Sequence, residues 1–324
     1  MPDLPLKLAC WDYDRTRPLI DGRVKPEGID LSVSVMRPQQ AFAKMLETDT
    51  FEIAEMSFSS YIVLKAQPLC PMIAIPVMLS KMFRHDCIYI RTDSGIRTPQ
   101  DLRGKRVGTI RYASTGVVYI KGFLQHDFGV YARDIHWFIG GLEVPVAAER
   151  PRGTPSDVQI TLLSERHTLE GMLAAGDLDA VITLQLPRSF MRKEPHISRL
   201  FPDFKTVEID YFRRTGIFPV MHTVVIRDTV HAANPWIARS MYDAFCAARD
   251  IALAGLYDSD ALHLSLPFLI DHIEETHRTL GPDFFSYGLA ANHASVAALC
   301  QYLHEQNLTD HPVAPKNLFA PGLD

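Results

Sequence analysis

Several signatures that would place this chain in a well-known class are missing from its 324 residues. No apolar run approaches the roughly 20 residues that a membrane-spanning helix needs. The first residues, MPDLPLKLACWDYD, lack the basic segment and the small-residue cleavage site of an export signal. The five cysteines lie far apart and form no C-x-x-C pair. These absences predict a cytoplasmic protein whose cysteines are small buried hydrophobic residues.

Charge of one sign is not concentrated anywhere along the chain. The formal net charge is only -5, and basic and acidic residues are interspersed, so we expect neither nucleic acid nor a membrane as a partner. A P-loop, a dinucleotide fingerprint, a G-x-S-x-G motif and zinc-ligand spacing are also absent, so a nucleotide enzyme or a nucleophilic hydrolase is unsupported. We expect no cofactor and assign no metal ligands; a requirement for a divalent metal is left open. The C-terminal histidines lack the same-face spacing of a zinc-binding helix and are interpreted as part of a solvated face: His263, His272 and His277.

The length is about twice that of a usual domain, so two domains are expected. With 47% hydrophobic and 22% charged residues, the composition is that of an ordinary globular protein. Short β-rich runs alternate with helical spacing, which predicts an α/β fold with mostly parallel sheets covered by helices. The expected strands are residues 6–11, 29–35, 51–56 and 71–77, and then 106–110, 134–139, 158–163 and 178–183.

Two extended runs, residues 83–91 and 216–226, are predicted to cross between two lobes and to act as a hinge. From Pro235 onwards the pattern is nearly all helical, and these helices are expected to pack on the first lobe. The assignment is residues 1–86 and 220–324 for lobe one, including the C-terminal helices, and residues 87–219 for lobe two. Two lobes joined in this way predict a ligand-binding cleft between them.

Residues 106–130 read as a strand, a polar turn and an amphipathic helix that ends at Gly129. Ser114 or Thr115 can cap the first helical turn, and the turn from Tyr112 onwards aims free N–H groups at an anion such as a carboxylate. The apolar residues of the expected helix recur at helical spacing: Val117, Ile120, Leu124 and Phe128. Most capped helices bind nothing, so a structural role is the alternative.

Other polar turns follow strands and should line the same cleft. The guanidinium of Arg15 has donors that match two carboxylate oxygens, although it can also pair with an aspartate of its own turn. Of the hydroxyls around Ser57 and Ser59, one is expected to cap the next helix and another to face the cleft. Arg188 lies in a further turn of this kind. Residues 140–157, rich in Gly and Pro, form either a lid or a plain surface connection.

Each crossing contributes a histidine. Arg84 and His85 are neighbours in the first crossing, so on an extended strand their side chains would point to opposite faces. His222 lies in the second crossing. Histidines near one cleft are candidates for proton transfer because their ordinary pKa lies close to neutrality, and hydrogen-bonded packing is the alternative.

Four long segments, in the same order and separation, closely resemble the 4,5-dihydroxyphthalate decarboxylase family. The segments are LACWDYDRTRPLIDGRVKPEGIDL, AEMSFSSY, MFRHDCIYIRTDSGIRTPQDLRGKRVG and YFRRTGIFPVMHTVVIR. The chain differs from the pattern of that family at Tyr119, Lys121, Ser286 and His293. These differences bear on the substrate more than on the fold.

The resemblance implies an enzyme built on the fold of type II periplasmic binding proteins. It also implies that a dihydroxyphthalate is converted to protocatechuate and carbon dioxide in phthalate catabolism. Arg15, Arg84 and a helix N-terminus would meet the substrate carboxylates, and His85 or His222 would supply a proton. Alternatives are a solute-binding protein for an aromatic acid, a decarboxylase for a related aromatic acid, and a pyrimidine-synthase-like enzyme of the same fold. A homo-oligomer is left open.

Overall fold

The computed structural model describes residues 2–147, 150, 154–261 and 264–323. The chain divides into two compact units, each of which is described by itself. Unit 1 contains residues 1–81, 220–296 and 314–324, and unit 2 contains residues 82–219 and 297–313. Residues 82–86 and 297–313, which the sequence pattern assigned to lobe one, thus have their contacts within unit 2. No helix among the described residues is long and apolar enough to cross a membrane.

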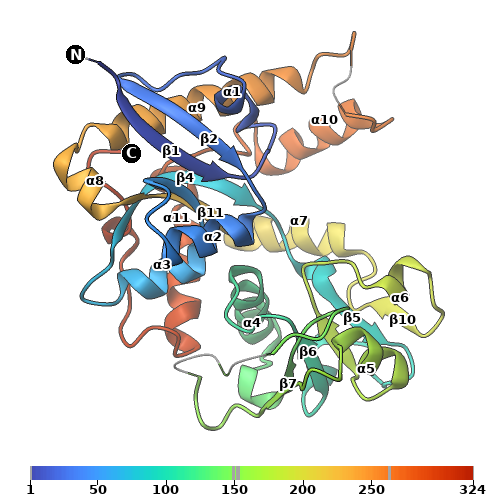
Figure 1. Ribbon diagram of the computed structural model, residues 1–324. Helices are drawn as coiled ribbons and strands as arrows, with labels where there is room; N and C mark the ends of the chain where they lie inside the picture. Colours follow the sequence, from blue (N-terminus) through green and yellow to red (C-terminus); the bar gives the residue numbers. More distant parts are fainter. Residues whose placement is uncertain (1, 148–149, 151–153, 262–263, 324) are drawn as a thin grey trace. The chain divides into compact units, whose positions relative to one another are not determined.

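Unit 1 is built on a five-stranded sheet with the order β2-β1-β3-β11-β4. Its strands are β1 (Leu4–Cys10), β2 (Ile29–Val35), β3 (Ile53–Ser57), β4 (Met72–Lys81) and β11 (Val220–Arg227). β1 is parallel to β2 and β3, as the alternation of strands and helices predicted, and the returning β11 is antiparallel to both β3 and β4. Figure 1 shows β1 and β2 in blue beside each other. β11 thereby brings a late segment of the chain between two early strands.

The helices of unit 1 cover this sheet. They are α1 (Arg17–Ile20), α2 (Pro38–Glu47), α3 (Phe58–Lys65), α8 (Asp228–Ala233), α9 (Ile237–Gly255) and α10 (Leu269–Leu280), with a 3-10 turn η4 (Pro315–Asn317). α9 packs against α1 and β4, as expected for the C-terminal helices. The last segment of the chain also joins this unit, because the Tyr61 hydroxyl donates to the carbonyl of Leu318 and Ala74 pairs with Phe319.

Unit 2 has a six-stranded sheet with the order β10-β5-β9-β6-β7-β8. Its strands are β5 (Ile88–Arg91), β6 (Arg106–Thr109), β7 (His136–Ile139), β8 (Ile160–Leu162), β9 (Ala180–Ile182) and β10 (Ile197–Arg199). β9, β6, β7 and β8 are parallel, and β5 is antiparallel to both of its neighbours. The other elements are η1 (His85–Cys87), η2 (Pro99–Leu102), α4 (Thr115–Phe128), η3 (Ala132–Asp134), α5 (Leu169–Ala175), α6 (Arg188–Met191) and α7 (Phe204–Thr215). A further helix, α11 (Leu289–Glu305), begins in unit 1 and ends in unit 2.

The expected strand across residues 83–91 is wrong in its first half. β4 ends at Lys81, the 3-10 turn η1 occupies His85–Cys87, and β5 begins only at Ile88. Arg84 and His85 therefore do not alternate across a strand. The backbone N–H of His85 donates to the side chain of Glu208 in α7 at 3.0 Å. This hydrogen bond stabilises the turn, whereas a strand would be paired with a neighbouring strand.

The helix that follows β6 is also more buried than predicted. α4 ends at Gly129, which adopts the left-handed conformation with φ +66°, as the sequence indicated. However, ten consecutive residues from Thr115 to Leu124 are buried, so the helix has no solvated face over this stretch. The last turns of α11 and the residue that follows it cover the face that we expected to be polar. This residue, Gln306, donates to the carbonyl of Val118 at 2.9 Å.

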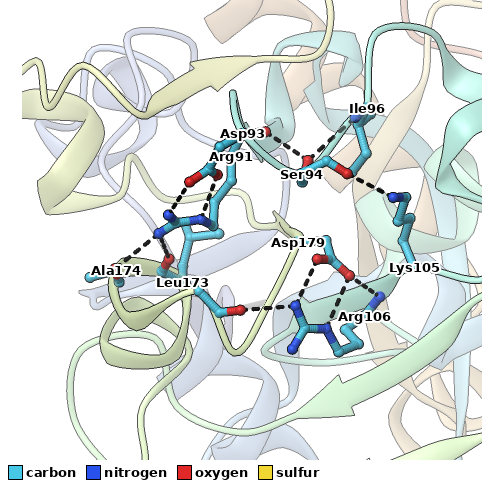
Figure 2. A network of polar contacts seen from close by, with 10 residues as sticks. Arg91, Asp93, Ser94, Ile96, Lys105, Arg106, Leu173, Ala174 and Asp179 are labelled. Carbon is cyan, nitrogen blue, oxygen red and sulfur yellow. Dashed lines mark hydrogen bonds and ion pairs between the residues drawn. The ribbon is translucent and has the colours of Figure 1, made fainter.

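Two arginines anchor the amino-terminal edge of the unit 2 sheet (Figure 2). Arg106, the first residue of β6, binds both carboxylate oxygens of Asp179 and the carbonyl of Gly176 at 2.8–3.1 Å. Burial acts against ionisation of Asp179, but the bonds from Arg106 outweigh it and lower the pKa of the carboxyl group. Arg91 binds the carbonyls of Leu173 and Ala174 at the end of α5. This network fixes the sheet at the edge opposite to the turn that leads into α4.

A glycine allows α11 to approach α4 within unit 2. A Cβ atom on Gly122 would lie 2.2–2.6 Å from ring atoms of Tyr302. We expect Gly122→Ala to lower the free energy of unfolding by about 1–3 kcal/mol, because the ring has to shift in a packed interior. Chemical denaturation of the variant measures this loss. The double variant with Tyr302→Leu should recover part of it, and a loss unchanged by the second substitution would contradict the assigned contact.

Candidate functional site

A fully buried carboxylate lies at the centre of the polar residues in unit 1. Glu55 is the third residue of β3, and its side chain has no exposed surface. One carboxylate oxygen accepts hydrogen bonds from the Tyr13 hydroxyl and from Nδ1 of His222, both at 2.7 Å. The other accepts from the backbone N–H of Trp11 at 3.0 Å. Burial opposes ionisation, but these bonds and the charge of His222 outweigh it and lower the pKa of Glu55.

The sheet places these groups together. In the ladder of β3 and β11, His222 is opposite Ser57, so its side chain lies on the same face as those of Ser57 and Glu55. Tyr13 comes from the turn after β1, which is the other neighbour of β3. Burial and the adjacent Glu55 raise the pKa of Tyr13, so its hydroxyl remains a donor near neutral pH.

His222 has the geometry of a proton-transfer residue. Its Nδ1 faces the Glu55 carboxylate, so the proton is held on Nδ1 and Nε2 is the atom left to exchange a proton. The ring packs edge-on against Phe42, with centroids 5.0 Å apart. The side chain is 19% exposed, in contrast to its buried partner Glu55. The histidine was expected from the sequence; Glu55 and Tyr13 were not.

Arg15 lies in the same unit, between two aromatic rings. Its guanidinium carbon is 4.1 Å from the ring centroid of Tyr13 and 4.5 Å from that of Phe285. Nε donates to the carbonyl of Leu79 at 2.7 Å, and Nη1 donates to Asp14 at 2.9 Å. The expected local pairing with aspartate is therefore real. Because a guanidinium carries five N–H donors, this arrangement also leaves donors for a ligand.

The serines at the start of α3 form a cluster of hydroxyls and not a helix cap. Ser57 is the N-cap residue, but its side chain makes no capping hydrogen bond, contrary to the expectation for one hydroxyl of this group. Its Oγ instead lies 3.4 Å from that of Ser59 and accepts a hydrogen bond from Ser60 at 3.1 Å. Ser59 is fully buried, whereas Ser57 is half-buried beside His222.

In unit 2, the start of α4 combines a helix N-terminus with a guanidinium. Ser114 is the N-cap residue, again without a side-chain cap, and Thr115 begins the helix in a buried position. The next residue is Gly116, where a Cβ would lie 3.4 Å from Nε of Arg84 and 2.7 Å from the side chain of Leu184. The absence of a side chain lets Arg84 approach the first turn. Positive charge and a helix N-terminus together favour an anion.

His85 has the surroundings of a packed histidine. Its side chain is 2% exposed and stacks on Phe123 with centroids 4.0 Å apart, and the rings of Phe201 and Tyr211 approach it edge-on. Nδ1 lies 3.7 Å from a carboxylate oxygen of Glu208 and makes no hydrogen bond within the described part of the chain. The packing alternative thus describes its geometry better, although its catalytic role stays a prediction.

Two other candidates also have structural partners. Tyr112 is 1% exposed, packs edge-on against Trp137, and has Nζ of Lys121 3.3 Å from its ring centroid. Burial lowers the pKa of Lys121 well below its ordinary value. Arg188 pairs with Glu143 at 2.8 Å, and its side chain is 66% exposed. Roles of Tyr112 and Arg188 in substrate binding remain predictions.

The structure describes only some of the remaining candidate residues. His263 and part of the proposed lid, residues 148–149 and 151–153, lie outside the described residues. His277 accepts or donates a hydrogen bond with the Tyr257 hydroxyl at 3.1 Å, and exposed His272 lies near Asp271 and Glu275. The expected cleft concerns both units together and stays a prediction.

Comparisons of the sequence identify relatives along the whole chain. The family model NMT1/THI5 like matches residues 24–139. The 4,5-dihydroxyphthalate decarboxylase of Comamonas testosteroni is 37% identical over 99% of this chain and 98% of the relative. The protein of the same name from Pseudomonas putida is 39% identical over 66% of this chain and 83% of the relative.

Comparisons of the structure concern the fold. The periplasmic aliphatic sulphonate binding protein SsuA from Escherichia coli matches with a TM-score of 0.53 and 14% identity, covering 99% of this chain and 98% of that one. The desulfurization enzyme DSZB matches with a TM-score of 0.53 and 14% identity, covering 99% and 97%. The predicted fold of periplasmic binding proteins is therefore confirmed.

The buried carboxylate generates a prediction for stability. We expect Glu55→Gln to lower the free energy of unfolding by about 1–3 kcal/mol at neutral pH, because an amide cannot accept from all three donors. Since the pKa of Glu55 is lowered in the folded protein, its contribution is present above the unfolded pKa of about 4.5 and is lost as the pH falls below that value.

Urea unfolding at about pH 7 and about pH 3 measures this pH dependence. The difference between wild type and Glu55→Gln should shrink at the lower pH. Glu52→Gln is the matched control, because the Glu52 carboxylate accepts an exposed bond from the backbone N–H of Lys7. Equal effects of the two substitutions at neutral pH would contradict the role given to Glu55.

Proposed function

The chain belongs to the 4,5-dihydroxyphthalate decarboxylase family, and we propose that it converts 4,5-dihydroxyphthalate to protocatechuate and carbon dioxide. The observation that carries this proposal is His222 held by the buried Glu55 in a chain that matches the Comamonas testosteroni relative over 98% of its length. The reaction requires a proton at a defined carbon of the substrate ring. A histidine held by a carboxylate can supply that proton.

The reaction replaces a carbon–carbon bond with a carbon–hydrogen bond. A proton adds to the ring carbon that carries the departing carboxylate, and the ring hydroxyl para to that carbon supplies electron density. The bond to the carboxylate then breaks, its electron pair returns to the ring, and neutral carbon dioxide leaves. The net change is an aromatic carboxylate plus a proton giving an arene plus carbon dioxide, so no oxidant or reductant is needed.

We assign the proton donor to His222. Its Nε2–H would protonate the ring carbon, and the Glu55 carboxylate on Nδ1 would orient the ring and stabilise the imidazolium before transfer. Tyr13 and the N–H of Trp11 hold Glu55 in place, so they act as positioning groups. The donor takes its next proton from water.

Arg15 is proposed to bind the carboxylate that stays on the ring. The departing carboxylate loses its charge on the way to carbon dioxide, so a cation on it would stabilise the ground state more than the transition state. The retained carboxylate keeps its charge throughout, and a guanidinium placed there binds both states. The flanking rings of Tyr13 and Phe285 hold that guanidinium in a fixed plane.

A place in phthalate catabolism follows from this substrate, and a cytoplasmic location and a homo-oligomer remain proposals.

Incubation of the purified chain with 4,5-dihydroxyphthalate, followed by detection of carbon dioxide and protocatechuate, tests the activity. Binding of the substrate without turnover would refute the proposed reaction and would favour a solute-binding role.

Replacement of His222 tests the donor. We expect His222→Gln to lower kcat by about 100-fold or more, the usual contribution of a general acid, while the Kd for substrate changes little. His85→Gln is the comparison, because the sequence offered both histidines. If His85→Gln abolishes turnover in a folded protein and His222→Gln does not, the donor is His85.

Replacement of Arg15 tests carboxylate binding. We expect Arg15→Ala to raise KM by about 10- to 100-fold, which corresponds to the loss of charge-assisted hydrogen bonds. Arg23→Ala is the control, because Arg23 lies nearby in sequence and pairs with Asp21 on the surface. An unchanged KM in a folded Arg15→Ala protein would remove this residue from the site.

A further inference from the structure

A buried cation, Lys81, lies in unit 1. Lys81 is the last residue of β4, and it is only 9% exposed. Its ammonium donates to the carbonyl of Phe284 at 3.2 Å. Burial lowers the pKa of Lys81 to about 8; the charge of Asp283 opposes this shift, and that of Arg249 adds to it. Lys81 is therefore mostly protonated at neutral pH and loses its charge within a mildly alkaline range.

Lys81 and Arg15 share an aromatic neighbour. Nζ of Lys81 is 5.5 Å from the ring centroid of Phe285, and the guanidinium carbon of Arg15 is 4.5 Å from the same centroid. Like charges gathered around one ring repel each other. An anionic ligand at this position would offset this repulsion.

A buried hydroxyl gives an independent indication of a ligand. Tyr287 is 4% exposed, and its hydroxyl has no hydrogen-bond partner among the described residues. Burial raises the pKa of Tyr287, whereas the charges of Arg15 and Arg249 act to lower it, which places both cations in its surroundings. The Arg249 guanidinium lies 5.0 Å from the Tyr287 ring. A buried hydroxyl among cations is a donor suited to a carboxylate oxygen.

We propose that Lys81 and Tyr287, together with Arg15, bind the retained carboxylate of the substrate and select a ring with two carboxylates. This proposal rests on the proposed function and extends it to specificity. Asp14 already pairs with Arg15, so that arginine alone offers little net charge. Lys81 adds a second positive charge, and the Tyr287 hydroxyl supplies a neutral donor. Protocatechuate, with one carboxylate fewer, would bind more weakly and leave.

Lys81→Met tests the cation. We expect KM for 4,5-dihydroxyphthalate to rise about 10-fold or more, with kcat within a few-fold of wild type, because the retained carboxylate is bound equally in both states. In wild type, KM should rise above about pH 8 as Lys81 loses its proton, and Lys81→Met should lack this rise. Lys7→Met, exposed on β1, is the control.

Tyr287→Phe covers the case in which Lys81→Met fails to fold. It removes one oxygen that has no hydrogen-bond partner among the described residues, so a purely structural role predicts equal or higher stability. We expect KM to rise several-fold with unchanged thermal unfolding. A normal KM in folded Lys81→Met, or in Tyr287→Phe, overturns the proposal.

Calorimetry with phthalate separates this inference from the activity. Phthalate carries both carboxylates but no hydroxyls, so its binding does not depend on turnover. We expect wild type to bind phthalate at least about 10-fold more tightly than Lys81→Met, and to bind benzoate weakly. Equal binding of phthalate by the two proteins refutes the role of Lys81 even if wild type decarboxylates. A large difference supports it even if wild type shows no turnover.

Discussion

The burial of the Glu55 carboxylate is the constraint on which unit 1 depends. A charge without exposed surface is tolerated only when hydrogen bonds replace its water, and two segments of the chain provide them. The turn after β1 supplies Tyr13 and the N–H of Trp11, and β11 supplies His222. The antiparallel insertion of β11 beside β3 is thus what completes the site, because it carries a late segment of the chain to an early strand. The same bonds that stabilise the sheet orient the imidazole.

Much of the fold could be predicted from the sequence, because strands and helices leave periodic patterns. The expected strand at residues 29–35 coincides with β2, and the helix after β6 ends at Gly129 as indicated. Patterns of this kind indicate local secondary structure but do not show which distant segments pack against an element. α4 was expected to be amphipathic, yet its other face is covered by Tyr302 from the distant end of α11 and by Gln306, which follows that helix. For the same reason, the sequence pattern assigned residues 297–313 to lobe one, although their contacts lie within unit 2.

The sequence predicts single residues of the site, but it does not show which residues they contact in the folded chain. His222 was found because each of the two expected crossing runs contains a histidine, whereas its partner was overlooked. Glu55 carried an equal signal, since an acidic residue inside the apolar run from Phe51 to Phe58 has to be paired when the strand is buried. The prediction that the side chains of Arg84 and His85 alternate across a strand was wrong, because a 3-10 turn replaces the expected strand there. Lys81 lies beyond the expected strand at residues 71–77 and gives no signal of its charged neighbours, because Arg249 and Asp283 are close only in the folded chain.

The likeness to SsuA and to DSZB, at 14% identity, shows a shared fold and leaves the chemistry to side chains. In a decarboxylase the placement of charge decides whether bound substrate reacts. A cation on the departing carboxylate would slow its conversion to neutral carbon dioxide, whereas a cation on the retained carboxylate costs nothing in the transition state. In unit 1, Arg15 and Lys81 approach the ring of Phe285, and the proposed proton donor His222 is held by Glu55. A binding charge placed on the retained carboxylate allows affinity to rise without raising the barrier, which is the arrangement that this reaction favours.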